Sequence, residues 1–117
     1  MGEPNEHGVY RPTESLTLPN PKQGWRSLRL AEIDLLELPD GWRSAIGAQL
    51  STHGRGEPIT LRSPVYVTRD QAIEAGIAKL RRWLASVDDS LAATVTRWLD
   101  GLNPEPPAQL DLFGAVA

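Results

Sequence analysis

The hydrophobic pattern follows a two-residue period in the first half of the chain and a helical period in the second. In residues 28–36, apolar side chains alternate with charged ones until the phase breaks at Ala31. A strand with a bulge near Ala31 fits this pattern. A helix is the competing interpretation, because Leu30, Ile33 and Leu36 also lie at helical spacing.

A turn at residues 39–41 favours the strand. Its sequence is Pro-Asp-Gly, in which proline presets φ and glycine can adopt a positive φ. In the strand that follows, alternate residues share one face: Trp42, Ser44, Ile46, Ala48 and Leu50. The two strands form a predicted hairpin. After a second turn at residues 51–58, residues 59–68 supply a third strand, which Pro64 confines to an edge or splits in two.

The strongest local signal is a helix that begins after Thr68. Thr68 and Gln71 have the spacing of a capping box, and Asp70 lies near the positive end of the helix dipole. A buried stripe follows at four-three spacing: Ile73, Ile77, Leu80, Leu84 and Val87. Gly76 weakens this helix by about 1 kcal/mol relative to alanine, and it marks a place for close packing against the sheet.

A second helix is expected from Asp88 or Asp89 to Gly101. Its apolar stripe comprises Leu91, Val95, Trp98 and Leu102. Asn103 and Pro104 prevent its continuation.

These elements predict an α+β fold, in which a small three-stranded antiparallel sheet is packed by one or two C-terminal helices. The predicted domain covers residues 25–102, and three strands with one covering helix can be stable alone. Residues 1–24 are expected to form a flexible arm because prolines interrupt every potential helix there. An edge strand containing Leu16 and Leu18 is the minor alternative for the arm. Residues 103–117 are expected to form a proline-rich linker and tail.

Composition indicates a small cytoplasmic protein rather than an exported or membrane-bound one. The 117 residues contain no cysteine, which excludes disulfides and thiolate metal sites. The first residues lack the basic and apolar regions of a signal peptide, and no apolar run reaches the length of a membrane span. No small-molecule ligand or cofactor is indicated.

Enzymatic chemistry is not expected. The only two histidines are His7, in the arm, and His53, beside a Gly-Arg-Gly turn. The sequence has no nucleophile elbow, phosphate-binding loop or pair of metal ligands at a typical spacing. The Asp88–Asp89 pair is best explained by helix capping.

Nucleic-acid binding by the body is one alternative. The segments "WRSAIGAQL" and "TRDQAIEAG" resemble, at the level of a three-stranded sheet followed by a helix, the AP2-like arm-binding domains of phage integrases. The resemblance implies that arginines on the sheet contact DNA, and the candidates here are Arg29, Arg43, Arg55 and Arg62. The net charge of −3 does not support a basic face, and basic and acidic residues balance within 25–102. A solvated polar sheet face is therefore the favoured interpretation of these arginines.

The last fifteen residues contain an apolar cluster behind a proline-rich spacer. The spacer "NPEPPA" favours extended polyproline II structure and discourages collapse. It is followed by the five residues Gln109, Leu110, Asp111, Leu112 and Phe113. The apolar side chains of Leu110, Leu112 and Phe113 either complete the protein's own core or enter the pocket of another molecule.

This pentapeptide resembles the bacterial sliding-clamp-binding motif, whose consensus is close to Gln-Leu-(Ser/Asp)-Leu-Phe. The resemblance implies that Gln109 forms hydrogen bonds at one subsite and that Leu112 and Phe113 enter a hydrophobic pocket between two clamp domains. Leu110 would pack along the connecting groove. The partner implied is the homodimeric ring of the DNA polymerase sliding clamp.

The sequence therefore favours a non-catalytic accessory or regulatory protein of DNA replication or repair, of the kind that phages or plasmids carry. It would dock on the clamp through residues 109–113, either to bring its body to DNA or to compete with the polymerase. The alternative is a small DNA-binding module whose tail packs on its own core.

Overall fold

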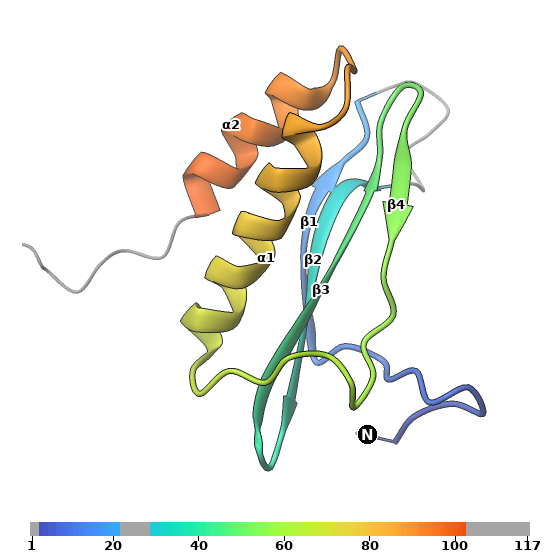
Figure 1. Ribbon diagram of the computed structural model, residues 1–117, viewed down its shortest axis with the longest axis vertical. Helices are drawn as coiled ribbons and strands as arrows, with labels where there is room; N and C mark the ends of the chain where they lie inside the picture. The colour runs from blue at the N-terminus through green and yellow to red at the C-terminus, as the bar shows by residue number, and fades with distance from the viewer. Residues whose placement is uncertain (1–2, 22–28, 103–117) are drawn as a thin grey trace, which may run out of the picture.

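The computed structural model describes residues 3–21 and 29–102, which form one layer of strands and one layer of helices (Figure 1). The strands are β1 (Glu14–Pro19), β2 (Arg29–Leu38), β3 (Gly41–Gln49) and β4 (Gly54–Gly56). They pair in the order β1-β2-β3-β4, and every pairing is antiparallel. The helices α1 (Arg69–Ala85) and α2 (Ala92–Leu102) follow the strands in the chain. The α+β class is therefore confirmed.

The sheet has four strands among the described residues, rather than the three expected, and two strands differ from the prediction. The minor alternative for the N-terminal segment is correct, because Leu16 and Leu18 pair with β2 and pack half-buried against the core. The strand predicted over residues 59–68 is wrong. In that segment Tyr66 forms a single bridge to Trp42, while β4 lies inside the predicted turn at 51–58.

The predicted bulge and hairpin are confirmed. Leu18 pairs with Ala31 and Pro19 pairs with Arg29, so Leu30 is the extra residue on β2. Gly41 closes the β2–β3 turn with a φ of +135°. A side chain at this position would be strained and would also place its Cβ 2.6 Å from the Tyr66 carbonyl oxygen.

Helix α1 begins as the sequence predicts. The Gln71 backbone N–H donates to Thr68 Oγ1 over 3.1 Å, and the Thr68 backbone N–H donates to Gln71 Oε1 over 3.3 Å. Both halves of the capping box are therefore present. The stripe residues Ile73, Ile77, Leu80 and Leu84 are buried.

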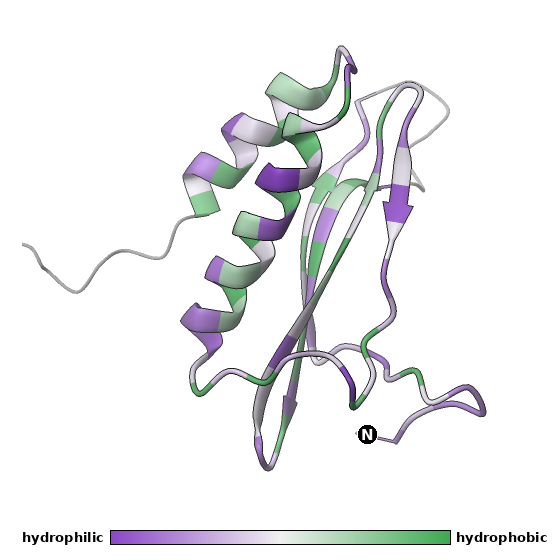
Figure 2. Cartoon of the chain, viewed as in Figure 1, coloured by the Kyte–Doolittle hydropathy of each residue, from purple (hydrophilic) through white to green (hydrophobic). Residues whose placement is uncertain are grey.

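Gly76 allows α1 to approach the sheet closely, as predicted. A Cβ at this position would lie 2.7 Å from Ile33 Cγ2, which is too close for a packed pair of carbon atoms. Figure 2 shows the apolar residues of α1 mainly on the side facing the sheet and polar residues on the outer side. One face of the sheet and the inner stripe of α1 thus form the main core.

Helix α2 begins later than expected and packs against α1. Its first residue is Ala92, because the chain between Asp88 and Leu91 is held by hydrogen bonds to Asp89 instead of continuing as a regular helix. Val95 and Leu99 are buried in the main core. A second, smaller cluster joins Leu36, Ala45 and Ile59 on the opposite face of the sheet.

Candidate functional site

The five residues of the predicted clamp-binding peptide, Gln109 to Phe113, lie outside the described residues. The described residues include the four arginines that are candidates for DNA binding. They also include a polar junction that joins the sheet to α2.

Two of the candidate arginines lie on neighbouring strands and are paired with carboxylates. Arg29 Nη1 lies 2.9 Å from Glu32 Oε1 on β2. Arg43, on β3, donates two hydrogen bonds to Asp40, over 2.9 and 3.0 Å. Arg43 is 3% exposed, so this candidate for DNA contact does not line an exposed face or rim of the sheet. It lies opposite Leu36, in the part of the sheet covered by the second cluster.

The other two candidates lie beyond β3. Arg55, on β4, has its Nη2 3.0 Å from Glu57 Oε2. Arg62 lies exposed in the loop after β4, where its backbone N–H donates to Thr60 Oγ1 over 3.1 Å. Arg29 and Arg55 line one shallow hollow of about 230 Å³, which they share with Glu32.

The arginines therefore do not form a basic patch. A carboxylate neutralises three of the four, and in the described part of the chain no ion pair engages Arg62. At Arg29 and Arg55 the paired carboxylate would compete with a phosphate for the guanidinium and offset its charge. This charge arrangement gives little support to DNA binding through the sheet.

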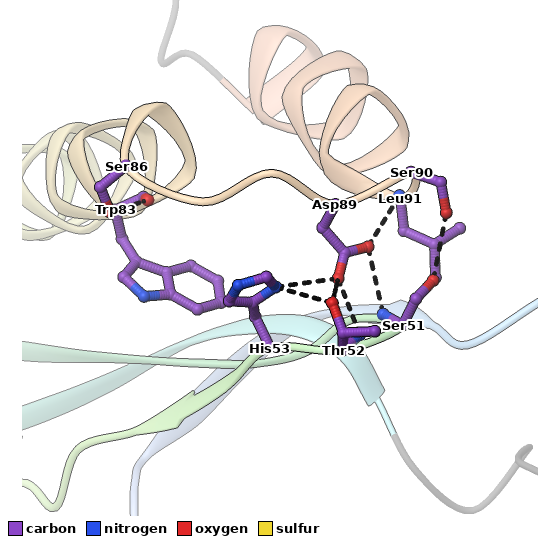
Figure 3. A network of polar contacts seen from close by, with 8 residues as sticks. All are labelled: Ser51, Thr52, His53, Trp83, Ser86, Asp89, Ser90 and Leu91. Carbon is purple, nitrogen blue, oxygen red and sulfur yellow. Dashed lines mark hydrogen bonds and ion pairs between the residues drawn. The ribbon is translucent and has the colours of Figure 1, made fainter.

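The most highly connected polar group is Asp89, at the junction of the β3–β4 turn and α2 (Figure 3). Its Oδ1 accepts from the backbone N–H groups of Ser51 and Leu91, over 3.2 and 3.0 Å. Its Oδ2 accepts from the backbone N–H of Thr52 over 2.8 Å and from Thr52 Oγ1 over 3.2 Å. The side chain is inaccessible to solvent.

These donors determine the ionisation of Asp89. Burial raises the pKa of the carboxyl, but the backbone N–H groups of Leu91, Thr52 and Ser51 lower it more, so the net pKa lies well below the usual range. The sequence indicates Asp89 only as a helix cap. Its second role, holding the β3–β4 turn, comes from residues 36 to 38 positions earlier in the chain and has no local sequence signal.

His53 is oriented by the same carboxylate. Its Nδ1 lies 3.3 Å from Asp89 Oδ2 and 2.9 Å from Thr52 Oγ1, and Figure 3 shows the Trp83 side chain pointing toward this imidazole. A carboxylate only accepts hydrogen bonds, so the contact with Asp89 Oδ2 requires a proton on Nδ1. The side chains of Thr52, His53 and Asp89 together fasten the β3–β4 turn to the segment before α2.

A second carboxyl behaves in the opposite way. Asp34, on β2, lies opposite Ala45 on the sheet face turned away from the main core. The pKa of Asp34 is raised to about 6. Burial is the largest cause and the negative charge of Glu32 adds to it, while the Ser15 hydroxyl acts in the opposite direction through a 2.7 Å hydrogen bond. This perturbed carboxyl has no sequence signal beyond its place on a strand.

Among residues 3–21 and 29–102, no cluster of three or more histidine, aspartate or glutamate side chains is placed to hold a metal ion. The helices in this part of the chain are too short or too polar to cross a bilayer.

Comparison with known proteins gives no assignment for this chain. No protein family model matches it, and neither the curated proteins nor the solved structures contain a match. Any function must therefore be argued from the residues themselves.

Proposed function

We propose that this protein docks on the bacterial DNA polymerase sliding clamp through residues 109–113 and acts as an accessory or regulatory factor in DNA replication or repair. The observation that carries the proposal is the run Gln-Leu-Asp-Leu-Phe, which matches the clamp-binding consensus at all five positions. Leu112 and Phe113 would supply most of the binding free energy by leaving water for a hydrophobic pocket.

Two features of the chain support this proposal. The linker between Leu102 and Gln109 contains three prolines, which favour an extended spacer between a folded body and a peptide. The core of the described residues already contains large buried side chains from β2, β3, α1 and α2. The sheet and the helices therefore share a core built from described residues, which favours a tail that is available to a partner.

The proposal assigns no catalytic role to the body. In the described residues the His53–Asp89 pair fastens the β3–β4 turn, and Arg29 and Arg43 are paired with carboxylates. Docking could affect DNA synthesis in either of two opposite ways. It brings the body to DNA or to another protein on the clamp, or it occupies the pocket that the polymerase uses and inhibits synthesis.

The proposal is tested by titrating the full-length protein against a bacterial sliding clamp by isothermal calorimetry. We expect saturable binding that the double substitution Leu112→Ala/Phe113→Ala abolishes. The matched control is Val116→Ala, an apolar truncation in the same segment but outside the pentapeptide, which should bind like the wild type.

Thermal unfolding of the same variants distinguishes clamp binding from the alternative, in which the tail packs on the protein's own core. If the tail packs on its own core, the double substitution lowers the midpoint of unfolding clearly and the wild type does not bind the clamp. If the tail is a clamp ligand, the midpoint stays unchanged. Primer extension with and without the protein then distinguishes recruitment from inhibition.

A further inference from the structure

The outer edge of β3 is covered by three different partners, with one gap. Strand β4 pairs along the end of β3 and places Arg55 opposite Ala48. Glu57 covers Ile46, and the single bridge from Tyr66 covers Trp42. Ser44 lies between the last two positions.

The backbone of Ser44 faces this gap. Trp42 and Ile46 direct their N–H and C=O groups to the outer edge, where they bond to Tyr66 and Glu57. Because backbone groups alternate along a strand, Ser44, two residues from each, directs its N–H and C=O to the same side. Within the described part of the chain, no hydrogen bond uses these two groups or Ser44 Oγ, although the residue is only 6% exposed. Buried backbone groups without partners are uncommon.

Ser44 opens into a hollow of about 300 Å³ under the loop that follows β4. The polar residues that also line the hollow include Glu57, Arg62, Ser63 and Lys79. Ser63 Oγ accepts from the Thr60 backbone N–H over 3.1 Å, so its own proton remains available for donation. The Glu57 carboxylate in this wall is paired with Lys79 and Arg55, whereas no described ion pair engages Arg62. The Ser44 N–H, the Ser63 hydroxyl and the Arg62 guanidinium are therefore the groups that favour an anionic ligand.

Glu57 shows what kind of group completes this edge. Its backbone N–H donates to the Ile46 carbonyl oxygen over 3.0 Å, and its carboxylate accepts from the Ile46 N–H over 3.2 Å. Lys79 Nζ lies 3.2 Å from the same carboxylate. One residue that combines an N–H with a carboxylate thus takes the place of a paired strand, two positions from Ser44.

We propose that the hollow at Ser44 binds an N-acyl α-amino carboxylate, such as the last residue of a peptide. The ligand N–H would donate to the Ser44 carbonyl oxygen, and its carboxylate would accept from the Ser44 N–H beside Arg62. The ligand would repeat at Ser44 the pattern that Glu57 makes at Ile46. This site uses only described residues and is independent of clamp binding by residues 109–113.

The test follows the Ser44 backbone amide by two-dimensional NMR while the full-length protein is titrated with N-acetyl-alanyl-alanine. We expect a saturable shift of the Ser44 amide with a dissociation constant in the millimolar range, as is reasonable for so small a ligand. Amidation of the peptide carboxylate should weaken binding at least about tenfold, since a charge-assisted hydrogen bond is lost.

Two variants test the walls of the hollow. Arg62→Gln should weaken binding several-fold and leave the thermal midpoint unchanged, because this side chain is exposed and forms no described ion pair. Arg82→Gln, an exposed arginine on α1 outside the hollow, is the charge-matched control and should bind like the wild type.

Other ligands identify the chemistry and its source. Equal affinity for N-acetyl-alanine and for the longer peptide would mean that a free N-acyl amino acid suffices, whereas tighter binding of the peptide points to a protein terminus; both support the proposal. Acetate or inorganic phosphate that shifts the Ser44 amide as strongly as the peptide would reduce the site to simple anion binding and overturn it. Absence of any saturable shift would also overturn it.

Discussion

Asp34 and Asp89 are both withdrawn from water, yet their ionisation differs in direction. The pKa of Asp34 rises to about 6, whereas the pKa of Asp89 falls well below its usual range. Asp34 has one described hydrogen-bond donor, the Ser15 hydroxyl, and an acidic neighbour in Glu32. Asp89 accepts from three backbone N–H groups and from side chains of the β3–β4 turn.

The comparison shows that donors, more than burial, decide whether a carboxylate stabilises this fold. Burial raises both pKa values. At Asp89 the backbone donors outweigh that penalty, and the charge joins two parts of the chain. At Asp34 a single hydroxyl does not outweigh it, and the ionised form is tolerated at a cost in stability.

The largest expected effect comes from removing the charge of Asp89. In Asp89→Asn, an amide group faces backbone N–H donors, so the β3–β4 turn loses its hold on α2. We expect a clear loss of stability at pH 7 in urea unfolding. The adjacent, exposed Asp88 offers the matched control, and Asp88→Asn should unfold close to the wild type.

The pH dependence of this loss is a separate check. Because the pKa of Asp89 is lowered on folding, its contribution is complete above pH about 4, the unfolded value, and declines as the pH falls through the folded value. The gap between wild type and Asp89→Asn should therefore narrow in strong acid. A gap that stays constant from pH 7 to pH 2 would contradict the role of the charge.

Asp34→Asn should change the free energy of unfolding in the opposite direction to Asp89→Asn. The raised pKa means that the folded state holds the proton more tightly, so this group's contribution is most favourable below pH about 4 and falls as the pH rises to about 6. At pH 8 the variant should be more stable than the wild type by about 1 kcal/mol, less than the full shift implies because the side chain is half-buried. By pH 4 the two should be equal. A variant less stable at pH 8 would contradict the assignment.

Local signals in the sequence are sufficient to predict much of this fold. The Thr68–Gln71 cap, the α1 stripe and the hairpin at Gly41 depend on residues a few positions apart, and the structure confirms each of them. Gly76 also had a readable signal, since a glycine inside a helical stripe suggests close packing. The class α+β follows from these elements.

The elements that were mispredicted depend on partners distant in sequence. β1 is short and two prolines precede it, and it forms because its backbone pairs with β2 while Leu16 and Leu18 pack against the core. A strand was predicted over residues 59–68, but the outer edge of β3 is bonded there by two single residues, Glu57 at Ile46 and Tyr66 at Trp42. Pairing of this kind leaves no periodic pattern.

The candidate sites also differ in whether their residues are close together or far apart in the sequence. The clamp-binding peptide is a linear motif, so the sequence alone defines it and its test is a binding experiment. The Asp89 junction, the perturbed Asp34 and the hollow at Ser44 each join segments separated by more than ten residues, and their chemistry appears only when the strands and helices are placed together.

The smallest expected effect sharpens the comparison at Asp34 without removing either carboxyl. Ser15→Ala deletes the hydroxyl that donates to Asp34 Oδ1 over 2.7 Å, so only the positive charge of Arg29 remains to lower this pKa against burial and Glu32. The pKa of Asp34 should then rise above its value of about 6, by less than about one unit, in an NMR titration of the carboxyl carbon. The carboxyl of Asp89 should titrate as in the wild type, since it shares no partner with Ser15. A lowered or unchanged Asp34 pKa would mean that the hydroxyl does not favour the ionised form, and the contrast between the two carboxyls would need a cause other than their donors.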